Sequence, residues 1–71
     1  MWIRYRDELI NTDNIVSMRI INMSGSHTLV FFATDSDQDV YGPDGSIEGL
    51  RKIINDIQTN LIAGAKWMKI G

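Results

Sequence analysis

Residues 42–61, which read GPDGSIEGLRKIINDIQTNL, decide the fold class, because the spacing of the apolar side chains changes within them. The segment opens with Gly42-Pro43-Asp44-Gly45, the strongest chain breaker in the sequence. Ser46 follows as a candidate N-cap, and Glu48 is favourable in a first helical turn. The apolar residues then recur at helical spacing and form one stripe: Ile47, Leu50, Ile53, Ile54, Ile57 and Leu61. The pattern predicts an amphipathic helix from Ser46 to about Ala63.

Upstream of this stretch, apolar and polar residues alternate, which is the period of a β-strand. Residues 2–6 and 15–22 show the alternation, and the apolar run 29–33 is typical of a central strand covered on both faces. A short strand is expected at Val40-Tyr41, whereas the tail 66–70 is too brief to decide. The expected fold is α+β, in a single domain over residues 1–71. It has a small antiparallel sheet of about four strands, arranged as a meander, with one C-terminal amphipathic helix packed on it.

The same periodicities predict the core. Its expected members are the inward-facing strand residues and the helical stripe: Ile3, Tyr5, Val16, Met18, Ile20, Leu29, Phe31, Leu50, Ile53, Ile54 and Ile57. A chain of 71 residues buries only about 60% of the surface that it exposes when unfolded. Such a thin core favours either efficient packing or a partner chain.

Composition excludes several classes of protein. The hydrophobic fraction of 44% and charged fraction of 23% are ordinary for a globular chain. No apolar run reaches the roughly 18 residues of a membrane span, and no secretory signal pattern opens the chain. The absence of Cys excludes disulfides and thiolate chemistry and fits a reducing compartment, so we expect a cytoplasmic protein. A net charge of −2 argues against a broad electrostatic grip on nucleic acid or a membrane.

One segment resembles a metal-binding motif. Residues 35–39, DSDQD, alternate carboxylates as the start of an EF-hand calcium loop does. The sixth position of that loop needs Gly and the twelfth needs Glu, but Val40 and Ser46 stand there. With one His, no Cys and no convincing pair of nucleophile and base, the sequence predicts no metal, no cofactor and no catalytic residue. We therefore expect that the protein is not an enzyme.

Six residues are candidates for intermolecular contact: Trp2, Arg4, Arg6, Arg19, Trp67 and Met68. If Arg4, Arg6 and Arg19 share a sheet face beside Trp2, they could hold single-stranded nucleic acid by stacking and charge. Asp7, Glu8 and Asp13 neutralise these cations in sequence, so charge on a wet strand face is the simpler interpretation.

The two Trp residues suit an interface, since indoles combine a large apolar body with a polar edge. We expect a dimer that buries Trp67 and Met68, or contact with another protein. The alternative is a monomer whose tail folds back as an extra strand. A non-catalytic interaction or accessory module is the leading prediction for function, and nucleic-acid binding is second.

The order of segments resembles a group of small, mostly uncharacterised bacterial and phage-type proteins. Ile10-Asn11, the strand 15–20, Val40-Tyr41 and the helix 46–57 carry the resemblance. FlbD-type flagellar proteins share a similar order over roughly residues 5–57, although their hairpin is usually shorter than the acidic segment 34–39 found here. The resemblance implies the same fold and a small accessory protein, and it transfers no functional residue.

Overall fold

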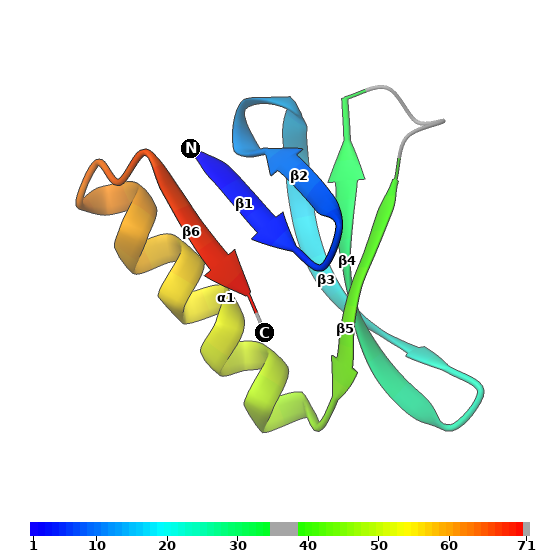
Figure 1. Ribbon diagram of the computed structural model, residues 1–71. Helices are drawn as coiled ribbons and strands as arrows, with labels where there is room; N and C mark the ends of the chain where they lie inside the picture. The colour runs from blue at the N-terminus through cyan, green and yellow to red at the C-terminus, as the bar shows by residue number, and fades with distance from the viewer. Residues whose placement is uncertain (35–38, 71) are drawn as a thin grey trace.

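Two small sheets and one helix enclose the core in the computed structural model, which describes residues 1–34 and 39–70 (Figure 1). The strands are β1 (Trp2–Tyr5), β2 (Glu8–Asn11), β3 (Ile15–Met23), β4 (Ser26–Ala33), β5 (Val40–Gly45) and β6 (Trp67–Ile70). A 3-10 turn, Thr12–Asn14, connects β2 to β3, and the helix α1 (Ile47–Ile62) connects β5 to β6. The predicted α+β class is confirmed.

The strands form two sheets of three, in the orders β2-β1-β6 and β3-β4-β5. The second sheet is antiparallel throughout, whereas β1 pairs antiparallel with β2 and parallel with β6. The prediction of one sheet of about four strands was therefore wrong, and α1 is not C-terminal because β6 follows it. The parallel pairing joins segments from distant parts of the sequence, and such a pairing leaves no local pattern to find.

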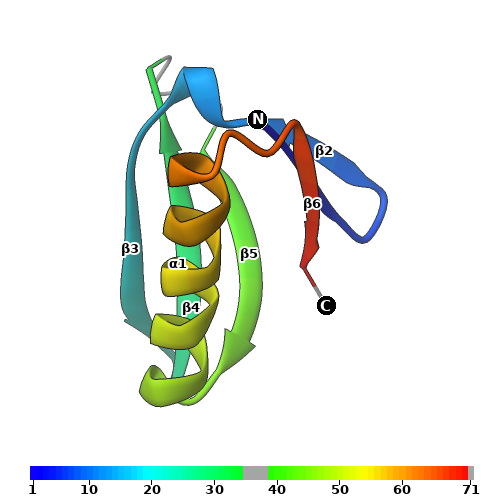
Figure 2. The same cartoon turned by 90° about the vertical axis from the view of Figure 1, so that its left-hand side faces the viewer.

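The helix begins and ends as the sequence predicts. The Ser46 hydroxyl accepts the backbone N–H of Gly49 at 3.0 Å, which satisfies one of the free donors of the first turn. Gly64 adopts a positive φ of 76°, as a residue that ends a helix often does. Leu50 and Ile57 are buried, and α1 lies over one face of the β3-β4-β5 sheet, with β6 beside it (Figure 2).

The core lies between the two sheets and the helix, and its buried members are Ile3, Tyr5, Ile10, Leu29, Phe31, Leu50, Ile57 and Ile70. Six of these were predicted, and Ile10 and Ile70 were missed. Four further predicted residues, Met18, Ile20, Ile53 and Ile54, are only partly buried against it.

Val16 was wrongly assigned to the core, because its side chain is 65% exposed. The register of β3 on β4 shifts between Ile15 and Ser17, so Val16 is the extra residue of a β-bulge. Ile15 takes the inward position instead and packs against the core.

The predicted breaker at Gly42-Pro43 does not end a strand, since β5 continues to Gly45. A second register shift occurs here, where Thr28 pairs with Asp44 but Val30 pairs with Tyr41. Gly42 and Pro43 thus stand opposite Leu29 in a bulge, a place where a sheet tolerates proline. A Cβ on Gly42 would lie 3.0 Å from the Leu29 carbonyl oxygen, a contact so tight that the strands would have to shift slightly to admit a larger residue.

Candidate interaction surface

Strand alternation gives the β2-β1-β6 sheet one buried face and one exposed face. In β1, Ile3 and Tyr5 enter the core, whereas Trp2 and Arg4 point away from it. The register places Trp2 between Asn11 and Trp67, and Arg4 between Leu9 and Lys69. We call the resulting surface the tryptophan face; its residues are Trp2, Arg4, Leu9, Asn11, Trp67 and Lys69.

The tryptophan face exposes three large apolar side chains, one from each strand. Trp2 is 48% exposed, Leu9 67% and Trp67 65%. Together with Arg4 they line a hollow of about 360 Å³. Because a single exposed apolar side chain is normal whereas a contiguous group marks an interaction site, this hollow is the leading candidate for a binding surface.

The charges on the tryptophan face have one sign. Arg4 and Lys69 are register partners on adjacent strands, and Lys66 directly precedes β6. Among residues 1–34 and 39–70, the register places no Asp or Glu on this face. The charges of the face itself are therefore cationic, although Asp7 and Glu8 line a hollow next to Arg4 and Leu9 and the whole chain carries a net charge of −2.

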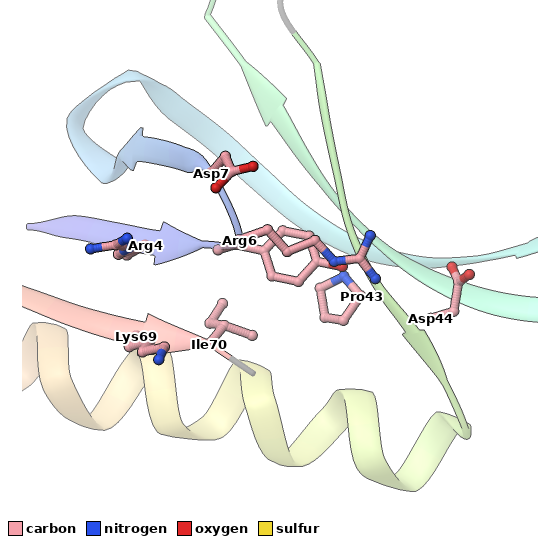
Figure 3. A pocket seen from close by; sticks show the side chains of 8 residues that line it. Arg4, Arg6, Asp7, Pro43, Asp44, Lys69 and Ile70 are labelled. Atoms are coloured by element: carbon pink, nitrogen blue, oxygen red, sulfur yellow. The ribbon is translucent and has the colours of Figure 1, made fainter.

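A second hollow, of about 580 Å³, lies where β1 and β6 end close to β5 (Figure 3). The side chain of Arg6 extends toward Pro43, and its guanidinium carbon lies 5.3 Å from the centre of the Tyr5 ring. Asp7 and Asp44 line the same hollow, so both signs of charge are present. Arg4 and Lys69 of the tryptophan face line this hollow as well.

The predicted cluster of Arg4, Arg6 and Arg19 does not form. Arg4 lies on the tryptophan face and Arg6 in the turn after β1. Arg19 belongs to β3 in the other sheet, where its guanidinium carbon lies 5.3 Å from the centre of the Phe32 ring. The 3-10 turn takes the chain out of the first sheet before β3 begins, so the two strands share no face.

Trp67 and Met68, which were expected to be buried together in an interface, lie on opposite faces of β6. The tail folds back as β6 beside β1. Trp67 faces outward, whereas Met68 pairs with the fully buried Ile3 and packs against the core. Leu9 and Lys69 were missed, although the alternation of Leu9 with Ile10 could have placed Leu9 on the exposed face.

The described part of the chain contains neither a metal-binding cluster nor a helix that could span a membrane. There, no three His, Cys, Asp or Glu residues gather in a way that could hold a metal ion. Residues 35–38 of the EF-hand-like segment lie outside the described residues, and the described Asp39 accepts the backbone N–H of Ala33 at 3.3 Å. No described helix combines the length and apolar character that a membrane span requires.

Comparison of the chain with models of protein families, with curated proteins and with solved structures finds no match. The resemblance to FlbD-type proteins therefore stays a prediction.

Proposed function

We propose that the protein is a non-catalytic interaction module whose tryptophan face binds an acidic protein segment with an exposed apolar side chain. The observation that carries the proposal is the hollow that Trp2, Leu9 and Trp67 form on three adjacent strands. Indoles supply large contact areas at little cost in side-chain entropy and are enriched among the residues that dominate binding energy.

Charge complementarity selects the partner. Arg4 lines the hollow and its register partner Lys69 lies beside it on β6, so both would meet carboxylates. A second copy of the same face would place its own cations against these two, which is repulsive. An acidic segment satisfies both the apolar hollow and the cations, so it is the occupant that the surface fits best.

Single-stranded nucleic acid is the second candidate, with Trp67 and Lys69 joining the expected Trp2 and Arg4 in place of Arg6 and Arg19. Bases stack on indoles, and phosphates pair with Arg and Lys. The closeness of two exposed indoles to two cations favours it. The small size of the cationic surface argues against it, because proteins that bind the nucleic-acid backbone gain most of their affinity from many phosphate contacts.

Peptide selection tests the proposal through the chemistry that the tryptophan face prefers. A random peptide library is selected on the wild-type protein and counter-selected on the Trp67→Ala variant. We expect the surviving peptides to combine Asp or Glu with an aromatic or aliphatic residue. Failure to recover any peptide that depends on Trp67 would contradict the proposed function.

Intrinsic fluorescence then measures the binding directly, because both Trp residues of the chain lie on the tryptophan face. A selected peptide should shift the indole emission, and Leu9→Ser should weaken its affinity by about tenfold through loss of apolar contact. Ile62→Ser is the matched control, since Ile62 is 80% exposed on α1 and should have no effect. A stronger, salt-dependent response to oligothymidine than to any peptide would favour the second candidate.

A further inference from the structure

The two edges of the β3-β4-β5 sheet differ in their protection against pairing with another strand. At the β5 edge, Pro43 lacks a backbone N–H and the bulge at Gly42-Pro43 breaks the ladder. Both features are common ways to prevent an edge strand from pairing. At the β3 edge, a strand of nine residues contains no proline and one charged residue, Arg19. The sheet is therefore closed to a further strand at β5 and open at β3.

Most of β3 is regular enough to accept a partner strand. Its bulge at Val16 affects only the first residues, and residues 17–23 keep an unbroken register on β4. Within residues 1–34 and 39–70, β3 pairs with β4 alone, and Figure 2 shows it along the border of the sheet. An edge of this kind presents a row of backbone N–H and C=O groups to a further strand.

We propose that β3 pairs antiparallel with β3 of a second copy of the chain, around a two-fold axis at Ile20. The result is a continuous sheet of six strands across the dimer. In this register Ile20 lies opposite Ile20 of the partner subunit, and Arg19 lies opposite Ile21 of the partner subunit. A register centred on Arg19 would instead place two guanidinium groups opposite each other, which destabilises a strand pair.

A second copy fits this edge because an antiparallel pair around a two-fold axis matches the strand to itself. Residues opposite each other share a sheet face, so the partly buried Ile20 would meet Ile20 of the partner subunit, and the partly buried Met18 would lie next to this pair, opposite Asn22 of the partner subunit.

Light scattering after size exclusion tests the dimer. The wild-type chain should have twice the monomer mass of 8.1 kDa at micromolar concentration. Ile21→Lys should convert it to a monomer. Each new ammonium would lie opposite Arg19 of the partner subunit, and this repulsive contact would occur twice in the dimer. Adding Arg19→Glu should restore the dimer, since each Lys would then face a Glu. Tyr41→Lys, an exposed change on the protected β5 edge, should leave the dimer mass unchanged.

Hydrogen exchange of the wild-type chain gives a second measurement, which does not depend on how the variants fold. Alternate amides of residues 17–23 point away from β4, and these should exchange slowly at high concentration and quickly on dilution. A monomer mass for the wild type, fast exchange of those amides at every concentration, or a dimer that survives Ile21→Lys would each overturn the proposal. A dimer lost with Trp67→Ala but kept with Ile21→Lys would move the contact to the tryptophan face and overturn it as well.

Discussion

Trp2 and Trp67 are register partners on adjacent parallel strands, so distant parts of the sequence build one exposed surface. The backbone N–H of Trp2 donates to the Lys66 carbonyl at 2.9 Å, which fixes the start of this pairing. At the other end of the ladder Tyr5 lies beside Ile70, and both side chains are buried. The tryptophan face thus depends on the anchoring of β6 through its inward side chains.

Ile70→Ala should destabilise the fold by about 2–4 kcal/mol, because the buried side chain leaves a cavity where β6 meets the core. Lys69→Ala removes the neighbouring exposed side chain and should change the free energy of unfolding by no more than about 0.5 kcal/mol. Urea unfolding followed by circular dichroism measures both variants. Equal losses in the two would mean that β6 does not contribute to the core.

Val16→Lys should be tolerated, within about 0.5 kcal/mol of the wild-type free energy of unfolding, because the bulge exposes that side chain. Ile10→Lys should abolish cooperative unfolding, since it buries an ammonium without a partner. Thermal unfolding of the two variants decides between the bulged register and the regular alternation. A severe loss with Val16→Lys would show that the regular register holds.

The sequence predicts those elements whose pattern is local. The stripe from Leu50 to Ile57 and the cap at Ser46 locate α1. The glycine at position 64, which adopts a positive φ in the structure, marks its end. Bulges escape such reasoning, because one extra residue shifts the alternation without changing the composition. The bulge at Val16 therefore misled the core prediction, and the bulge at Gly42 looked like a chain break.

The candidate surface was predictable only in part. Trp2, Arg4 and Trp67 were singled out by residue type, and all three lie on the tryptophan face. Their gathering depends on the parallel pairing of β1 with β6, which the sequence left open. The prediction for Arg19 failed for a different reason. Placing Arg19 on the face of Arg4 required a single sheet, and the chain forms two.

The side chains of Thr28 and Asp44 should prove energetically coupled. The Thr28 hydroxyl, on a residue only 5% exposed, donates to the Asp44 carboxylate at 2.6 Å across β4 and β5. Asp44→Ala leaves that hydroxyl unpaired and should cost about 1–3 kcal/mol. In the double variant with Thr28→Val the cost should be smaller than the sum of the single costs. Strictly additive losses in urea unfolding would show that the hydrogen bond contributes nothing.

Gly42→Ala should destabilise the fold, because the added Cβ would lie 3.0 Å from the Leu29 carbonyl oxygen and 3.1 Å from Cε2 of Phe31. Both neighbours are held in place, one as backbone of the central strand and the other as a fully buried ring. Relief of this contact requires the β5 bulge to move away from β4, and overpacking of this kind typically costs about 1–3 kcal/mol.

Gly45→Ala, on the same strand, is the matched control for this change. Its Cβ would meet only Cδ2 of Leu50, at an ordinary contact distance of 3.9 Å. Since alanine also restricts the unfolded chain, the control should be neutral or slightly stabilising, by up to about 1 kcal/mol. Urea unfolding compares the two variants under the same conditions. Equal urea midpoints for Gly42→Ala and the wild type would contradict this prediction. They would show that β5 passes Leu29 at a greater distance.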